Sequence, residues 1–166
     1  STSYIPTSGS SVTRNQDVCT NGGSLASINS TEGVLYAEIA ALADDGTNRY
    51  ISLSDGSTSN RVVLRFNTNN QISGFVVSGS TQAIFNYSVD ILNKNKVALK
   101  WKVNDFALWV NGVEIGTDNI GTTPIGLDRL RFNDAINNGQ EFNGKTKAVA
   151  VFPYLTDAEL TELTTI

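Results

Sequence analysis

The sequence contains no histidine, no methionine and a single cysteine, Cys19. Without histidine, Ser-His-Asp catalysis, Cys-His catalysis and histidine-ligated zinc sites are excluded. One cysteine cannot form an internal disulfide, so the disulfide framework of a small secreted domain is excluded as well. A reactive thiol is one reading of Cys19; we interpret it instead as a small residue on an early strand. These absences indicate recognition or architecture rather than chemistry.

Long apolar runs and an excess of basic residues are also missing. No stretch approaches the ~20 consecutive apolar residues of a membrane span, and no signal peptide opens the chain. The net charge is −4 and the pI about 4.7, which argues against general nucleic-acid binding. We therefore expect neither a membrane nor a nucleic acid among the partners.

What the chain does contain is typical of one domain built from short strands and turns. It has 166 residues, of which 40% are hydrophobic and only 17% are charged, while Ser, Thr and Asn make up nearly a third. The first 11 residues are rich in Ser, Thr, Gly and Pro, which is the composition of a linker that follows another domain. We expect a linker over residues 1–11 and a single domain over residues 12–166.

Between Glu32 and Phe152 short apolar runs alternate with turn sequences rich in Asn, Asp and Gly. Asn111-Gly112 lies between two such runs and predicts a two-residue hairpin, because both turn positions need a positive φ. Many short strands with turn chemistry throughout predict an all-β fold, an antiparallel β-sandwich or barrel. The expected strands are 34–39, 49–53, 61–66, 72–77, 82–87, 96–103, 106–110, 127–132 and 147–152.

One short C-terminal helix closes the pattern. Thr156 and Glu159 have the spacing of a capping box, in which each side chain satisfies a free amide at the helix start. Leu155, Leu160 and Leu163 give the helix an apolar side. We expect it to cover an edge or an end of the sandwich.

Side chains alternate between the two faces of a strand, so each run divides into an inward and an outward set. In the run 96–103, valine, leucine and tryptophan share the core side and lysine occupies the other. In the run 106–110, Trp109 points outward, and in the run 127–132 both arginines do. We therefore predict an exposed indole among cations on one surface, and the candidate carbohydrate-binding residues are Trp109, Lys100, Lys102, Arg129 and Arg131.

Such a surface suits a polymeric sugar, particularly an anionic one. The flat indole would stack on the apolar face of a pyranose, while Lys and Arg would pair with carboxylate or sulfate. The alternative is structural: outward cations on strands keep a sheet soluble and prevent edge pairing, and a loop or neighbouring domain could cover Trp109. Lys145 and Lys147 do not fit the alternation, because it places them with the apolar Val149 and Val151. We expect a β-bulge there, or a strand that contributes differently.

Two further patterns carry less weight. Asp44-Asp45-Gly46 with Asn48, and Asn133-Asp134, offer oxygens at calcium-like spacing, but neither belongs to a complete ligand loop. We expect no cofactor, with calcium left open. Glu38 stands alone in its strand and Glu114 follows a hairpin turn, so the paired carboxylates of glycoside hydrolysis are missing. We therefore do not expect an enzyme.

A resemblance to a known type of domain extends over nearly the whole chain. It is carried by the opening run TSYIPTSGSSVTRNQDV, by EGVLYAEI, ISLSDGSTSNRVVLRF and LDRLRF, and more specifically by NDFALWVNGVEIGTD at residues 104–118 and KAVAVFPYLTDAEL at residues 147–160. Together they resemble the concanavalin A-like, or laminin G-like, jelly-roll modules at the C-terminal ends of phage tail and other virion proteins. The resemblance implies two packed antiparallel sheets, a module that is commonly non-catalytic and often glycan-binding, and a virion or extracellular location. It also implies an upstream β-sandwich domain as a neighbour.

From these features we expect a non-catalytic module of a phage structural protein that binds a polysaccharide or a cell-surface glycan. One alternative is a virion decoration or assembly module that packs on other subunits without binding glycan. A polysaccharide-degrading enzyme is the other alternative, and it would need an acid pair or a Tyr/Arg cleft that we cannot assemble from the sequence.

Overall fold

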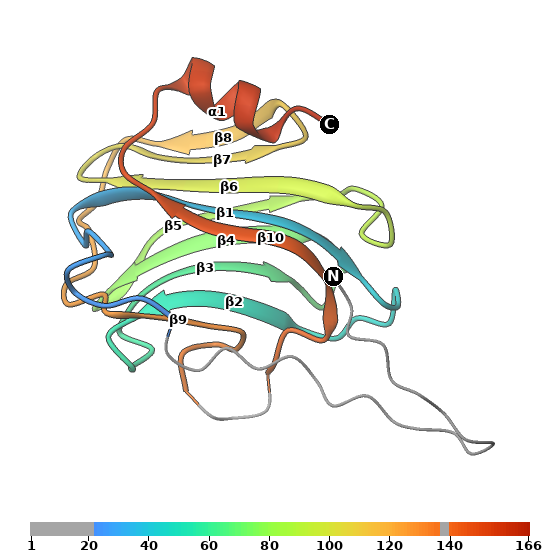
Figure 1. Cartoon of the computed structure of the whole chain (residues 1–166), viewed down its shortest axis with the longest axis horizontal. Helices are drawn as coiled ribbons and strands as arrows, with labels where there is room; N and C mark the ends of the chain where they lie inside the picture. The colour runs from blue at the N-terminus through green and yellow to red at the C-terminus, as the bar shows by residue number, and fades with distance from the viewer. Residues whose placement is uncertain (1–21, 137–139) are drawn as a thin grey trace.

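The computed structural model describes residues 22–136 and 140–166. The expected linker and Cys19 lie outside the described residues. Two antiparallel sheets of five strands each pack face to face, and Figure 1 shows these layers with one helix against the upper one. The predicted antiparallel β-sandwich with one short C-terminal helix is confirmed.

Each sheet draws its strands from distant parts of the chain. Sheet A has the order β5 (Ser80–Tyr87), β4 (Ile72–Ser78), β3 (Asn60–Phe66), β2 (Arg49–Ser54) and β9 (Arg129–Arg131). Sheet B has the order β10 (Gly144–Phe152), β1 (Glu32–Ala41), β6 (Asn95–Lys102), β7 (Phe106–Val110) and β8 (Val113–Asp118). The expected strands are all present with ends shifted by a few residues, and the structure adds β8, the second arm of the Asn111-Gly112 hairpin.

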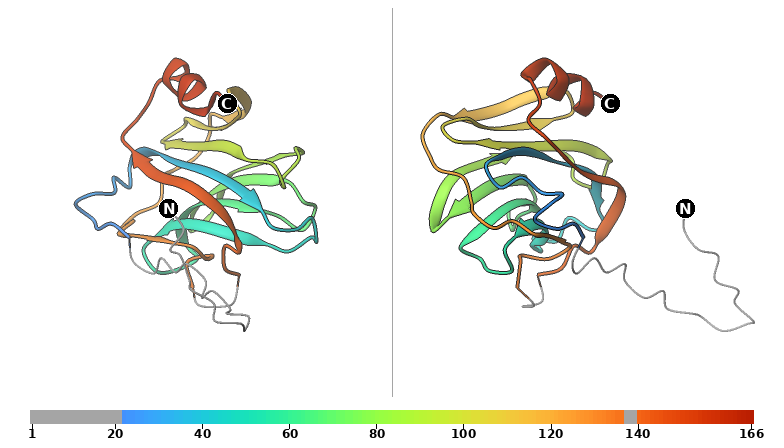
Figure 2. Two further views of the ribbon diagram at one scale, coloured as in Figure 1. Left: turned by 45° about the vertical axis from the view of Figure 1, so that its right-hand side comes forward. Right: turned by 60° about the vertical axis from the view of Figure 1, so that its left-hand side comes forward.

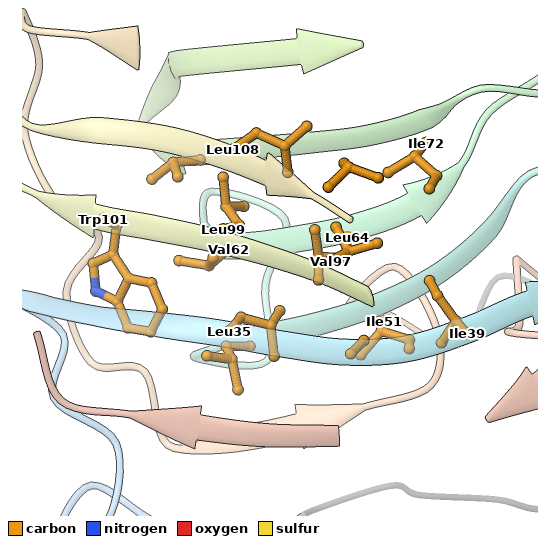
Figure 3. Packing of buried hydrophobic residues seen from close by; sticks show 14 of the residues in the cluster. Leu35, Ile39, Ile51, Val62, Leu64, Ile72, Val97, Leu99, Trp101 and Leu108 are labelled. Carbon is orange, nitrogen blue, oxygen red and sulfur yellow. The ribbon is translucent and has the colours of Figure 1, made fainter. Parts of the chain in front are cut away.

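The main core lies between the two sheets. Figure 3 shows Leu35, Leu99 and Trp101 of sheet B facing residues of sheet A. The sheet A side includes Ile51, Val62 and Leu64, and all of these side chains are fully buried. The inward and outward sets predicted for β3, β6 and β7 therefore have the correct alternation.

A β-bulge resolves the misfit of the two lysines in β10. The β1–β10 register shifts between Glu38 and Ile39, so that Ile39 is opposite Thr146 and Glu38 is opposite Ala148. Lys147 is the extra residue, and its Nζ reaches Glu38 on the outer side of sheet B. Because of this one-residue shift, Val149 and Val151 still pack against the main core.

Helix α1 (Asp157–Thr164) begins with the predicted capping box. The Glu159 amide donates to Thr156 Oγ1, and the Thr156 amide donates to Glu159 Oε2 over 2.7 Å. The helix contacts β6, β7 and β8, and both views in Figure 2 show it at the same end of the molecule as the β7–β8 hairpin. It packs on the outer face of sheet B where this sheet ends in its edge strand β8, and we predicted that it would cover an edge or an end of the sandwich. No helix in the described part of the chain has the length and apolarity to cross a membrane.

Candidate functional site

Trp109 points away from the main core, as predicted, but its predicted exposure is wrong. Only 1% of the residue is exposed. It belongs to a second apolar cluster on the outer face of sheet B, which α1 closes with Leu160. A helix of the same chain buries the indole, so its burial requires no oligomer. Trp109 is not available as a stacking platform for a sugar.

The two candidate lysines on β6 are held by acidic residues. Lys100 is 3% exposed, and its Nζ lies 2.8 Å from Asp105 and 3.0 Å from Asp157 of α1. Burial tends to lower the pKa of Lys100, but the hydrogen bonds to both aspartates outweigh it and raise the pKa above its ordinary value. Lys102 pairs with Glu32 over 3.0 Å. The ion pair of Lys100 with Asp157 connects β6 to α1, and that of Lys102 with Glu32 connects the paired ends of β6 and β1.

The two candidate arginines lie on the other sheet. Arg129 and Arg131 belong to β9, the edge strand of sheet A, where they flank the register partner of Leu53. The structure therefore does not bring the five predicted residues together, because the two sheets turn their outer faces in opposite directions. Alternation along a strand gives the side on which a residue lies, but it does not say to which sheet the strand belongs.

Cations are in fact divided by type between the two sheets. Every lysine lies on β6 or β10 or, for Lys94, in the loop that leads into β6. Four arginines lie on the outer face of sheet A. Register partners place them in three rows across the strands: Tyr50–Arg65–Ser73–Asn86, Arg131–Ser52–Val63–Phe75–Ile84, and Arg129–Ser54–Arg61–Val77 followed by the β4–β5 bulge. We call this surface the arginine face.

Two guanidinium groups on the arginine face converge on one aromatic ring. Arg61 and Arg65, both on β3, place Cζ 5.2 Å and 5.0 Å from the centre of the Phe75 ring. Arg65 also lies 5.4 Å from the centre of the Tyr50 ring and donates to the Tyr50 hydroxyl over 2.7 Å. Cation–π contacts of this kind hold a guanidinium plane in place and leave its edge available for hydrogen bonds.

Among the described residues, neither of these guanidinium groups forms a salt bridge. Within the described ranges, no carboxylate oxygen lies within 4.0 Å of Arg61 or Arg65, whereas Arg49 and Arg129 are each paired with an aspartate. The Nε atoms of Arg61 and Arg65 are buried without a hydrogen-bond partner. Burial lowers the pKa of Arg61 and the charge of Arg65 acts in the same direction, while the charges of Asp134 and Tyr50 oppose this change without cancelling it. Two close, partly buried positive charges of this kind would gain from a bound anion.

Beside these guanidinium groups, the segment 133–136 forms one wall of the arginine face. Arg61 Nη1 donates to the Asp134 carbonyl over 2.7 Å, and Arg131 Nη1 donates to the Ala135 carbonyl over 2.8 Å. Ala135 is fully buried and adopts a φ of 87°, a conformation that costs free energy for a residue other than glycine. The carbonyl groups of this segment therefore orient the guanidinium groups of Arg61 and Arg131, and the backbone of Ala135 is strained.

The polar side chains of the turns that we considered for calcium form hydrogen bonds and ion pairs with nearby residues of the chain. Asp45 pairs with Arg49 over 2.8 Å, and Asn133 Oδ1 accepts from the Ala135 amide. Over residues 22–136 and 140–166 there is no group of three or more Cys, Asp or Glu side chains arranged to hold a metal ion.

Sequence reasoning placed Arg61 and Arg65 outward but did not choose them as site residues. The available signal was their spacing: two arginines four apart on one strand lie on the same side, with Val63 between them. Their aromatic partners could not be found in this way, because Phe75 and Tyr50 come from neighbouring strands whose register only the structure gives.

The fold is similar to that of known carbohydrate-binding modules. No protein-family model matches the sequence, and no curated protein sequence matches it. The carbohydrate-binding module CBM40 of the Ruminococcus gnavus IT-sialidase, bound to α2,3-sialyllactose, superimposes with a TM-score of 0.70 at 17% identity. The match covers 91% of this chain and 95% of that module.

Two further similar structures come from more distant proteins. The carbohydrate-binding module CBM66 from Bacillus subtilis matches with a TM-score of 0.52 at 11% identity, over 74% of this chain and 75% of the module. A native heptameric SAP-like pentraxin from Limulus polyphemus matches with a TM-score of 0.57 at 14% identity, over 78% of this chain and 68% of the pentraxin. At these identities the likeness concerns the fold, so the chain has the β-sandwich fold that carbohydrate-binding modules and pentraxins share.

Proposed function

We propose that this chain is a non-catalytic carbohydrate-binding module, and that the arginine face binds a sugar carrying a carboxylate or sulfate group. One observation carries the proposal: Arg61 and Arg65 both lie over the ring of Phe75, and neither forms a salt bridge among the described residues. The ligand would supply the missing anion.

The chemistry of guanidinium groups favours such a ligand. Arginine presents several N–H donors in one plane, which match the two oxygens of a carboxylate. Stacking on Phe75 and Tyr50 fixes that plane before the ligand arrives, so less conformational entropy is lost on binding. Since the whole chain carries a net charge of −4, attraction of an anion depends on this local concentration of arginine.

The comparisons support a carbohydrate as the ligand. The similar Ruminococcus gnavus module has been crystallised with α2,3- and with α2,6-sialyllactose, both of which are acidic glycans. A sialidase from Streptococcus pneumoniae, NanB, also matches with a TM-score of 0.65 at 13% identity over 87% of this chain, but the match spans only 27% of that enzyme.

Calorimetric titration with 3′-sialyllactose, and with lactose as the matched neutral glycan, tests the proposal. We expect binding of the acidic glycan only, weakened by added salt. Arg61→Ala and Arg65→Ala should each weaken it by about 10- to 100-fold, the effect of losing one charge-assisted hydrogen bond. Lys147→Ala is the matched control, because it removes one positive charge from an exposed position on sheet B. Binding that both arginine variants leave unchanged would contradict the proposal.

We also propose, from the sequence resemblance at residues 104–118 and 147–160, that the module belongs to a phage or virion surface protein. In that setting it would act outside the cell, next to an upstream β-sandwich domain, and attach the particle to a glycan on its host. Proteomic analysis of gradient-purified particles from the source is the test. Particles that lack the protein would overturn this assignment and leave the glycan-binding proposal untouched.

A further inference from the structure

A cleft of about 470 Å³ lies at the edge of sheet A, beyond β9. One side is the turn formed by residues 23–26, and the other is the adjacent pair Asp128 and Arg129. Gly22 exchanges backbone hydrogen bonds with Leu130, which adds this segment to the sheet next to β9. Figure 1 shows the segment before β1 descending beside β9. The cleft therefore continues sheet A on the side where β9 carries its two arginines.

The register fixes how far the cleft lies from the proposed anion site. Ser54 of β2 is the partner of Arg61 on one side and of Arg129 on the other. Arg61 and Arg129 therefore share a row, two strand spacings or about 9.6 Å apart along the backbone. This backbone separation exceeds the width of one sugar ring and matches the length of a chain of two or three sugars.

The groups that line the cleft suit an uncharged sugar. Arg129 Nε and Nη2 both donate to the Asp128 carboxylate, the latter over 2.8 Å, so the two charges compensate each other. Arg129 Nη1 has no hydrogen-bond partner among the described residues, and each carboxylate oxygen can accept a further bond. A donor beside an acceptor is the arrangement that two neighbouring sugar hydroxyls require. Leu25 is 67% exposed and offers an apolar surface to a ring face.

The pair is held firmly in place. The hydrogen bond with Arg129 lowers the pKa of Asp128 from its ordinary value, so the carboxylate stays ionised at neutral pH. The Asp128 amide donates to the Ser54 carbonyl over 3.0 Å, and the Arg129 guanidinium packs against Gly56, where an added Cβ would lie 2.8 Å from Nη1. Such rigidity reduces the entropy that binding costs.

We propose that this cleft is a second subsite, which binds an uncharged sugar joined to the anionic sugar at Arg61 and Arg65. The inference rests on the proposed function and extends it: the ligand is an acidic oligosaccharide of at least two residues, with Asp128 and Arg129 bonding hydroxyls of the uncharged residue and Leu25 contacting its ring.

Comparing free sialic acid with 3′-sialyllactose separates the two subsites. In wild type the trisaccharide should bind about tenfold more tightly than the monosaccharide. Asp128→Asn and Leu25→Ser should remove most of that difference and leave the affinity for sialic acid unchanged. Leu25→Ser changes an exposed side chain, so it tests the cleft even if Asp128→Asn weakens folding. Lys147→Ala should alter neither affinity.

The possible failures are distinguishable. If Arg61→Ala weakens both ligands while Leu25→Ser and Asp128→Asn bind both like wild type, the second subsite is wrong and the anion site stands. If Leu25→Ser and Asp128→Asn weaken both ligands equally, the cleft acts on the whole face and is not a separate subsite. If Arg61→Ala and Arg65→Ala bind both ligands like wild type, the proposed function itself fails.

Discussion

Arg65 donates a hydrogen bond of 2.7 Å to the Tyr50 hydroxyl while its guanidinium lies 5.4 Å from the centre of the same ring. The tyrosine thus contacts the cation in two ways, through its π system and through its oxygen. Phe75 of the neighbouring strand β4 contacts the same guanidinium, with Arg65 Cζ 5.0 Å from the centre of the Phe75 ring. The orientation of Arg65 is therefore a property of the folded protein before any ligand binds.

Tyr50→Phe separates these two contacts. The ring remains, but the acceptor for Arg65 Nη1 is lost, so the guanidinium is less well oriented. We expect affinity for 3′-sialyllactose to fall about 3- to 10-fold, since a neutral acceptor contributes about 1 kcal/mol. Tyr36→Phe, a hydroxyl removal on sheet B, is the matched control and should leave the affinity unchanged. Equal affinities of all three proteins would show that the hydroxyl does not orient Arg65.

Arg61→Lys retains a positive charge but lacks the planar group that stacks on Phe75. If the site depends on charge alone, this variant should bind nearly as well as wild type. We expect instead that it loses about tenfold in affinity, because an ammonium group is a point charge that cannot make a planar, bidentate contact with a carboxylate. Titration at low and high salt checks this, and the variant should retain most of the salt dependence.

Trp109→Ala should affect stability and not binding. The indole is buried beneath α1 on sheet B, so its removal leaves a cavity and should lower the free energy of unfolding by about 3–5 kcal/mol. Denaturant unfolding measures this loss. Affinity for the acidic glycan, measured where the variant is folded, should equal that of wild type. A loss of affinity in the folded variant would return Trp109 to the binding site.

Thr156→Ala removes the cap of α1, and its effect should be smaller. The Thr156 hydroxyl accepts from the Glu159 amide, and such caps contribute about 1 kcal/mol. We expect the free energy of unfolding to decrease by that amount. The change in tryptophan fluorescence that follows exposure of Trp109 should occur at a lower denaturant concentration than in wild type. Thr161→Ala changes a hydroxyl within the same helix and should cost less. Equal losses in the two variants would show that the capping box does not hold the helix.

Glu38 makes stability depend on pH in a defined direction. The hydrogen bond from Lys94 lowers its pKa below the ordinary value, burial opposes this, and Lys147 adds to it. Between the ordinary and the folded-state pKa, the unfolded chain binds a proton that the folded chain does not. This contribution is therefore complete above the ordinary pKa and disappears as the pH falls through the folded-state pKa.

Glu38→Gln should consequently be less stable than wild type at pH 7, and the difference should shrink on acidification below pH ~4. Denaturant unfolding over a range of pH measures it. Glu114→Gln, which removes the charge of an exposed residue of β8 without an ion pair among the described residues, is the matched control. A constant difference for Glu38→Gln would contradict the assignment.

The sequence contained enough information for the strands, the hairpin at Asn111-Gly112 and the capping box, because each is a local pattern. The alternation pattern also showed that Lys147 does not fit a regular strand and predicted a β-bulge, which the β1–β10 register confirms. Trp109 shows where it stops. Alternation correctly placed the indole away from the main core, but its burial depends on a helix that begins 48 residues later and returns over the sheet.

The candidate site failed at a different step. Lys100 and Arg129 were both correctly placed outward, yet they lie on sheets whose outer faces point in opposite directions. Strand order is a long-range property that no single run encodes. The arginine face depends on the same information, since Phe75 of β4 meets Arg61 and Arg65 only through the pairing of β3 with β4.

The shared register of Ser54 has a consequence for how ligand preference could diversify. The backbone separation of Arg61 and Arg129 is fixed by the pairing of their strands with β2, and side-chain substitutions at these two positions do not change it. Substitutions at either subsite would therefore change which sugar is bound there without affecting the other subsite. The distance between the two bound sugars would stay the same. An insertion or deletion in β2, β3 or β9 would shift the register of these strands and so change this separation.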